Sequence, residues 1–261
     1  MQLEHWMKYM EEIAPAELAE SWDNSGLLIG PERRELRHVL LALDCTEAVA
    51  EEAKWIGADL VLTHHPLFFS PVKRILPDDP GTAAAWKLIR YGIGLFSAHT
   101  NLDRAKGGVN DALAETLGIK DAVPYGDGTG RIGMLEEEVA LENFVRMCEN
   151  VLHTVVSYTG NPMKRVRRIA VLGGAGGSMI REAADAGADV YLTGEAKHHE
   201  GIASEVLGIS LLAAGHDETE RVILPVLMDR LQGMSDDIKY SLALSDGGPF
   251  RRGTGGKMHE Q

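Results

Sequence analysis

The fold of this chain is decided by residues 41–63, which read LALDCTEAVAEEAKWIGADLVLT. Residues 39–43 form an apolar run typical of a buried strand, Thr46 can cap the helix that follows, and residues 58–62 form a second apolar run. Strand, helix and strand in this order favour two parallel strands joined by a helical crossover.

The same pattern returns 130 residues later, as VLGGAGGSMIREAADAGADVYLT in residues 171–193. A third apolar run, residues 93–98, matches residues 209–214 at an offset of 116. Chance similarity between two Ala-rich units is the alternative. We predict an α/β fold of two similar, duplicated domains, each with a mostly parallel sheet flanked by helices.

A Gly-rich stretch, residues 121–130, separates the two copies. It predicts a first domain of residues 1–126 and a second of residues 127–261. The polar, Gly-rich tail from Asp246 to Gln261 is expected to be loosely held.

Composition excludes several classes of protein. There are 26 Lys+Arg and 39 Asp+Glu, so the net charge is −13, which disfavours general binding of nucleic acid and suits metal cations. No apolar run approaches the roughly 18 residues of a membrane span, and no signal-peptide pattern is seen at the N-terminus. Cys45 and Cys148 lack metal-site spacing and are expected to be reduced core thiols. We expect a cytoplasmic protein without a membrane partner.

Two adjacent histidines, His64 and His65, end the predicted strand of residues 60–63, and Pro66 follows them. Open α/β sheets bind their ligands at the carboxyl ends of strands. Neighbouring side chains of an extended segment point to opposite sides, so the pair could address two metal ions, or one ion and a substrate. A pair of solvated histidines is the alternative.

The third predicted strand of each copy is followed by a histidine with a carboxylate four positions later. These are His99 with Asp103, and His216 with Glu220. Positions i and i+4 share a helix face, so His216 and Glu220 could bind one ion, whereas Asp103 precedes Gly107-Gly108 and is expected in a loop. An exposed helix start is the alternative for His216 and Glu220.

Mixed imidazole and carboxylate ligands suit Zn, Mn, Fe or Ni ions. Two such ions about 3.5–4 Å apart, bridged by a carboxylate, activate water. Residues 195–200, which include His198 and His199, could contact the ligands or substrate, or could be a polar loop. Residues 173–178, GGAGGS, could bind phosphate or be a simple turn, because they match no nucleotide-binding motif.

With these motifs in place, the chain resembles the NIF-three-like family of metal-binding proteins, many of which carry the label GTP cyclohydrolase 1 type 2 homologue. The resemblance covers nearly the whole chain. It rests on Trp22–Leu27, Leu62–Leu67, Ser97–Asp103, Gly107–Asn110, Tyr191–Glu195, and Gly215-His216 with Glu220.

The resemblance implies a dinuclear metal centre of two divalent ions per chain. Its implied ligands are His64, His65, Asp103, His216 and Glu220, and His99 lies nearby as a candidate catalytic residue. It also implies a toroidal homohexamer with the metal sites facing an internal cavity. Only about 65 residues separate Asp103 from the second copy, so this is the short form without an inserted domain.

Two functions compete at this point. The first is a metal-dependent hydrolase, GTP cyclohydrolase-like, whose ions activate water against a nucleotide ring or another polarised carbon or phosphorus centre. The second is a non-catalytic metal-handling or regulatory protein. A ring that threads nucleic acid is disfavoured by the net charge.

Overall fold

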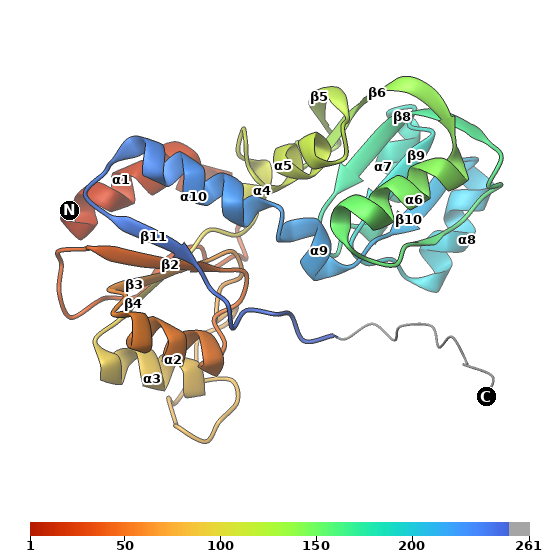
Figure 1. Ribbon diagram of the computed structural model, residues 1–261. Coiled ribbons are helices and arrows are strands. Elements are labelled where there is room, and N and C mark those ends of the chain that lie inside the picture. Colours follow the sequence, from red (N-terminus) through yellow and green to blue (C-terminus); the bar gives the residue numbers. More distant parts are fainter. Residues whose placement is uncertain (251–261) are drawn as a thin grey trace, which may run out of the picture.

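Two sheets organise the chain in this computed structural model, which describes residues 1–250 (Figure 1). The first half contains α1 (Leu3–Ile13), η1 (Ala16–Leu18), β1 (Gly26–Ile29), β2 (His38–Ala42), α2 (Glu47–Ile56), β3 (Leu60–Thr63), α3 (Ala83–Tyr91), β4 (Gly94–Ser97) and α4 (Thr100–Arg104). The second half contains α6 (Leu141–Leu152), β7 (Ser157–Tyr158), β8 (Arg165–Leu172), η2 (Gly177–Met179), α7 (Ile180–Asp185), β9 (Val190–Thr193), α8 (His198–Leu207), β10 (Ser210–Ala213) and α9 (His216–Glu220). Between the halves lie α5 (Val109–Thr116), β5 (Lys120–Tyr125) and β6 (Gly130–Ala140), and the last elements are α10 (Ile223–Met234) and β11 (Lys239–Leu242).

The predicted repeat is confirmed by the register of the strands. In β2 and β3 Leu41 lies opposite Leu62, and in β8 and β9 Val171 lies opposite Leu192, which is the offset of 130 seen in the sequence. Both neighbouring pairs are parallel, and an antiparallel strand closes one edge of each sheet, β1 beside β4 and β7 beside β10. The two halves therefore repeat a helix, an antiparallel edge strand and three parallel strands with their crossover helices.

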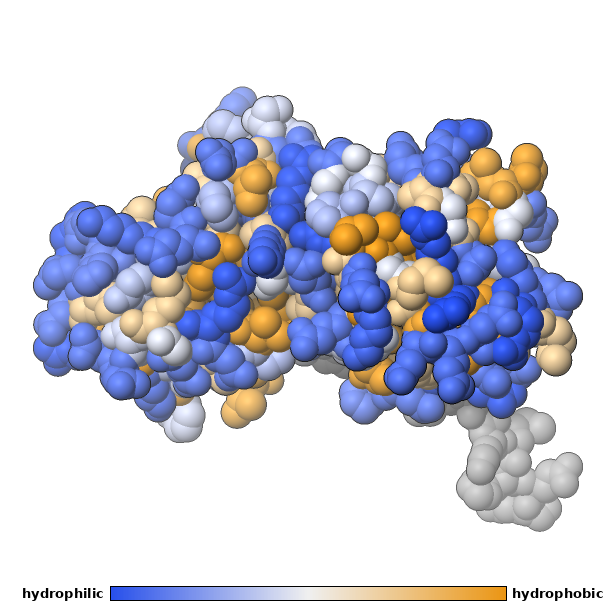
Figure 2. Space-filling model, turned by 90° about the horizontal axis from the view of Figure 1, so that it is seen from above, coloured by the Kyte–Doolittle hydropathy of each residue, from blue (hydrophilic) through white to orange (hydrophobic). Residues whose placement is uncertain are grey.

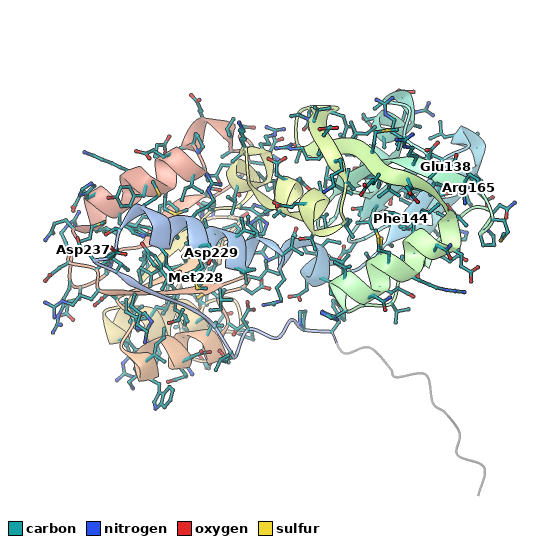
Figure 3. All side chains as sticks on the ribbon, turned by 45° about the horizontal axis from the view of Figure 1, so that its top comes forward. Glu138, Phe144, Arg165, Met228, Asp229 and Asp237 are labelled. Atoms are coloured by element: carbon teal, nitrogen blue, oxygen red, sulfur yellow. The ribbon has the colours of Figure 1, made fainter. Side chains whose placement is uncertain are left out.

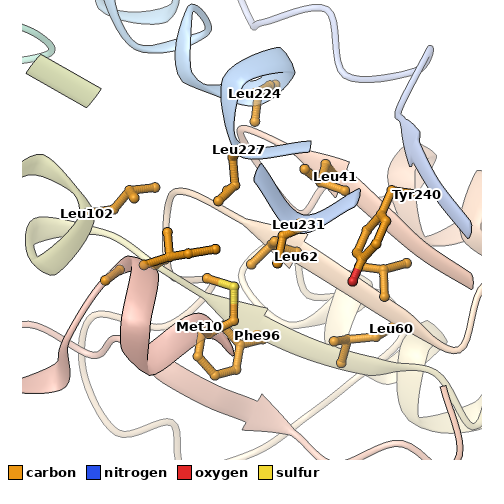
Figure 4. Close-up of a cluster of buried hydrophobic side chains, with 14 of the residues drawn as sticks. Met10, Leu41, Leu60, Leu62, Phe96, Leu102, Leu224, Leu227, Leu231 and Tyr240 are labelled. Carbon is orange, nitrogen blue, oxygen red and sulfur yellow. The ribbon is translucent and has the colours of Figure 1, made fainter. Parts of the chain in front are cut away.

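Helices cover both faces of each sheet, which explains why the parallel strands are apolar throughout. In the first half α1 and α10 lie on one face and α2 and α3 on the other (Figure 1). Leu41 and Leu62 point to the α10 face, where Leu227 and Leu231 meet them (Figure 4), and Leu40 points to the opposite core. The alternation of side chains along each strand thus builds two cores from one run of apolar residues.

The last helix and strand cross back to the first half. The strand β11 pairs in parallel with β2, so the first sheet has the order β1-β4-β3-β2-β11. Figure 3 shows Met228 and Asp229 on α10, which packs on this first half, and Phe144 on α6 in the second.

The helix α5 and the strand β5 make the reciprocal crossing. Leu113 and Leu117 of α5 pack in the core of the second half, and β5 joins a sheet of order β5-β6-β8-β9-β10-β7. A single division near residue 126, as the sequence suggested, does not describe the chain. Residues 109–125 lie before that point but complete the second half, and residues 223–242 lie after it but complete the first half.

The surface seen from above is mostly hydrophilic, with apolar side chains in separate patches (Figure 2). The longest helices, α6 and α10, have 12 residues, and within residues 1–250 no helix could span a bilayer. Cys45 and Cys148 are buried free thiols, as expected.

The start of the C-terminal tail is held in place, contrary to expectation. Asp246 is buried, accepts a hydrogen bond from the main-chain N–H of Leu43 at 2.6 Å and pairs with Arg221 at 3.0 Å. The rest of the predicted loose tail, residues 251–261, lies outside the described residues.

Candidate metal centre

The histidines singled out in the sequence meet between the two halves. His64 and His65 directly follow β3, His99 precedes α4, and His216 is the first residue of α9. These positions lie at the carboxyl ends of parallel strands, as predicted for ligands of an open α/β sheet. Asp103 lies inside α4 and not in the loop that the sequence suggested.

One group of donors combines both halves. Glu220 Oε2 lies 2.9 Å from His65 Nε2 and 3.1 Å from His216 Nε2, and the two imidazole nitrogens are 3.3 Å apart. The expected sharing of one helix face by His216 and Glu220 is therefore what the structure shows. The helix α9 brings these side chains against a histidine from the other half.

A second group lies on the other side of Glu220. His64 Nε2 is 3.6 Å from Asp103 Oδ1 and 3.9 Å from Glu220 Oε1. The donor atoms of His64, His65 and His99 all lie within 4.8 Å of one another. The two oxygens of Glu220 thus face two different groups of donors.

Each of these four histidines is oriented through its Nδ1 atom. The acceptors are Ala98 O for His64 at 2.8 Å, Asp44 for His65 at 2.9 Å, Asp23 for His99 at 2.9 Å, and Glu195 for His216 at 3.2 Å. An acceptor on Nδ1 leaves Nε2 as the ligand atom and fixes the ring, which is the usual arrangement around metal-binding histidines.

Two buried polar atoms test whether a metal fits here. His64 Nε2 has no hydrogen-bond partner although His64 is 2% exposed, and Glu220 Oε2, in a residue 5% exposed, faces only the two imidazole nitrogens of His65 and His216. Buried polar atoms normally have partners because leaving them unpaired costs free energy. A divalent cation would satisfy both atoms, so the donor set fits a metal.

The charges of the cluster are strongly coupled. Burial lowers the pKa of His64 to about 4 and, together with the nearby charge of Glu220, raises the pKa of Asp103 well above its usual range. Burial opposes a charge on His65, but hydrogen bonds with Asp44 and Glu220 raise its pKa to about 10. Protons and cations therefore compete for the same atoms, and metal affinity should fall as the pH falls.

Glycines allow α9 to reach the centre. A Cβ atom on Gly174, whose φ is +64°, would lie 2.0 Å from Glu220 Oε1. One on Gly194 would lie 2.6 Å from the carbonyl oxygen of Gly174 and 2.8 Å from the Cα atom of His216. Gly194 occupies the repeat position of His64. The second half therefore has a glycine in place of a histidine, and this allows α9 to pack closely against the strand end.

The glycine-rich turn has this packing role, and three of its N–H groups donate within the protein. The N–H groups of Gly173, Gly174 and Gly176 donate to side chains, namely Asn110 Oδ1 at 2.8 Å, Thr219 Oγ1 at 3.0 Å and Thr193 Oγ1 at 2.9 Å. The suggested phosphate cradle is therefore not formed by these three N–H groups.

Two carboxylates of the site, Asp23 and Asp44, were not among the predicted site residues, and they orient His99 and His65 respectively. Asp44 follows β2, at the same sheet edge as His64, and that position was the available signal. Of residues 195–200, only Glu195 contacts a candidate ligand, whereas His198 and His199 are exposed at the start of α8.

Fold and site together define a protein of two interlocked α/β repeats with a histidine and carboxylate cluster between them. The chain belongs to the Duf34/NIF3 (NGG1p interacting factor 3) family, whose model matches residues 1–247. It is 34% identical over 259 residues to a Clostridium perfringens protein named GTP cyclohydrolase 1 type 2 homolog, covering 96% of this chain and 99% of that one. It is 35% identical to a Schizosaccharomyces pombe protein named Protein NIF3 homolog, covering 85% of each. The crystal structure of a Bacillus cereus protein related to NIF3 superposes with a TM-score of 0.90 at 26% identity, over 97% of this chain and 99% of that one.

Proposed function

We propose that this chain binds two divalent metal ions between its halves and uses them to hydrolyse a small substrate. The observation that carries the proposal is Glu220, which presents one oxygen to His65 and His216 and the other toward His64. A carboxylate in such a position can bridge two ions. His64 and Asp103 would hold one ion, His65 and His216 the other, and Glu220 both.

When bound, such a pair of ions supplies Lewis-acid activation of water and of the substrate. Zn, Mn, Fe and Ni all suit these ligands. His99, which lines the cavity, is the candidate for moving a proton. Its Nδ1 is bound to Asp23, so proton transfer would use Nε2.

Asp23 holds the ring of His99 with Nδ1 bonded and Nε2 directed away from Asp23. Despite burial, hydrogen bonds from His99, Thr100 and Ser25 keep the pKa of Asp23 well below its usual range. The carboxylate therefore stays charged and accepts the Nδ1 proton of His99 over the whole neutral range.

The cavity beside the centre favours an enzyme over a metal carrier. It has a volume of about 1210 Å³ and is lined by His65, His99, Asp103, His216 and Glu220. An ion carrier needs no cavity of this size. The cavity would admit a substrate as large as a nucleotide. The related proteins named GTP cyclohydrolase 1 type 2 homolog make ring opening of a purine nucleotide the first reaction to test.

The test combines elemental analysis with turnover. His65→Ala and Glu220→Ala should each lower the metal content while circular dichroism stays unchanged, and His198→Ala should change neither. Wild type purified with its metal should turn over at least one compound in a nucleotide and nucleoside screen, and a chelator should abolish the activity. A protein that keeps two ions and turns over nothing would contradict the hydrolase proposal and leave metal handling.

His99→Gln separates two roles of His99 within this proposal. Glutamine keeps a hydrogen bond but does not titrate, so a proton carrier would lose turnover at unchanged metal content. Loss of metal instead would make His99 a ligand or an orienting residue.

We also propose that copies of the chain assemble into a ring of six in the cytoplasm. Exposed apolar side chains such as Trp55, Ile202 and Val206 support an assembly, and the two free thiols fit a reducing compartment. Mass measurement in solution tests the assembly, and a monomer at micromolar concentration would exclude it.

A further inference from the structure

We propose that the cavity selects a planar nitrogen heterocycle without a phosphate chain, neutral or cationic, such as a nucleoside or a free base. This inference rests on the proposed function for the role of the ligand as substrate. Binding to the walls of the cavity can be tested in the absence of metal and of turnover.

Two aromatic side chains form one wall. Trp22 and Phe69 line the cavity and remain 59% and 55% exposed. Their ring centroids lie 6.0 and 5.7 Å from that of His99, so both stand directly beside the metal centre. Exposed aromatic faces at a ligand site bind planar rings by stacking, and every nucleobase offers such a face.

The two segments that carry these rings are tied together. Asn24 Nδ2 donates to the main-chain oxygen of Phe68 at 2.6 Å, and Asp23, next to Trp22, is anchored on His99 and Thr100. The aromatic wall is therefore positioned before a ligand arrives, which lowers the entropic cost of binding.

The charged side chains in the rest of the lining are mostly acidic. Apart from Asp103 and Glu220 it includes five carboxylates: Glu20, Asp44, Glu47, Asp127 and Asp246. Among the described residues, Arg104 is the one arginine that lines the cavity, and no lysine does. These five carboxylates outnumber Arg104 and the protonated His65, so the wall repels a polyanion and attracts cations and N–H donors.

Arg104 is already committed to carboxylates. Its Nη2 atom lies 2.5 Å from Glu20 and 2.6 Å from Asp127, and its Nε donates to Thr129 at 3.0 Å. Polyphosphate sites are built from arginine, lysine or free main-chain N–H groups. Here the arginine is paired, and three N–H groups of the glycine turn are bonded to side chains.

A nitrogen heterocycle suits both features. Its face can stack on Trp22 or Phe69, and its N–H groups can donate to the surrounding carboxylates. A positive charge on the ring would add a favourable interaction with the indole face. The metal centre would then act on a ring atom and not on a phosphate.

The experiment measures binding by calorimetry on chelator-treated protein, with guanosine, adenosine and their triphosphates as probes. Each nucleoside that binds should bind at least ten-fold more tightly than its triphosphate. Trp22→Ala or Phe69→Ala should weaken nucleoside binding about ten-fold, the size of one lost stacking contact. Tyr158→Ala, an exposed aromatic residue on β7 outside the cavity lining, is the control and should leave nucleoside binding unchanged.

A second variant tests the effect of charge. Glu20→Gln with Asp127→Asn releases Arg104 and removes two negative charges, and this should raise triphosphate affinity roughly ten-fold relative to nucleoside affinity. Equal or tighter binding of the triphosphates by wild type, no nucleoside binding, or no effect of the two aromatic variants would overturn the inference. If wild type with its metal turns over no compound while these binding results are obtained, only the hydrolase proposal is contradicted.

Discussion

The two halves of the molecule agree down to single hydrogen bonds and differ where the chemistry lies. In each half the aspartate of a Gly-Ala-Asp sequence accepts the same pair of main-chain N–H groups, those of Arg37 and His38 for Asp59, and those of Arg167 and Arg168 for Asp189. The shared residues therefore maintain the backbone of the repeat.

The ligands do not follow the repeat. Ser97 lies opposite Thr63 and Ala213 opposite Thr193, so the third strands are related by an offset of 116 and Asp103 corresponds to Thr219. The histidine and carboxylate are four residues apart in both copies, but the pair lies one residue later in the second copy. After β3 the backbone carries the adjacent histidines His64 and His65, whereas after β9 the equivalent backbone carries Gly194 and is closely approached by α9.

The largest expected effect comes from weakening the packing of α10 on the first half or of α5 on the second half. Leu231→Ala on α10 and Leu113→Ala on α5, both fully buried, should each lower the free energy of unfolding by about 2–5 kcal/mol. Hydrogen exchange should accelerate first in β2 and β3 for Leu231→Ala and first in β8 and β9 for Leu113→Ala. Equal acceleration in both halves for either variant would contradict the reciprocal packing.

The next effect concerns the glycine that replaces a histidine. Gly194→Ala places a methyl group against main-chain atoms and should cost about 1–3 kcal/mol and lower the metal content, because α9 must move away. His64→Ala should lower the metal content with a smaller loss of stability. Gly30→Ala, which has open space around its Cβ position, is the control. A stable Gly194→Ala protein with full metal content would refute the close-approach argument.

The shared aspartates should behave alike. Asp59→Ala and Asp189→Ala each remove two hydrogen bonds to main-chain N–H groups and should each cost about 1–2 kcal/mol. The two losses should agree within about 0.5 kcal/mol, and the metal content should not change. Urea unfolding measures the first quantity and elemental analysis the second. A twofold difference between the losses would show that the halves are less equivalent than their hydrogen bonds.

The smallest effect distinguishes the two sheets by pH. Burial and the nearby Lys239 lower the pKa of His38 below its ordinary 6.5, and its Nε2 bonds to Ser241 Oγ at 2.8 Å across β2 and β11. As the pH falls, His38 takes up a proton in the unfolded chain before it does so in the folded one. The contribution of His38 should therefore lower the free energy of unfolding as the pH drops below 6.5 and have no effect above it.

His38→Gln isolates this contribution, which should be on the order of 1 kcal/mol or less. Glutamine does not titrate, so the variant should lose less stability than wild type between pH 7 and pH 5 in thermal unfolding. Its counterpart in the second half is Arg168, so the second sheet has no histidine at this position. An identical fall in both proteins would assign the acid sensitivity to other groups.

Local pattern was sufficient for the frame of the fold. Apolar runs, the Thr46 cap and the repeated Gly-Ala-Asp depend on residues close in the chain, so they predicted the parallel strands and the offset of 130. The histidines could be placed at strand ends for the same reason. The crossing of α5 and α10 could not be predicted, since either helix could cover either sheet.

The sequence by itself determined the repeated α/β units and the residue types that gather at their strand ends, because strand polarity and side-chain alternation follow from neighbours in the chain. Only the tertiary structure decided which half each helix completes, that Asp23, Asp44 and Glu195 orient the imidazoles, and that Gly174 and Gly194 make room for Glu220. These contacts join residues far apart in the chain, and their strength depends on distances and burial that no local pattern contains.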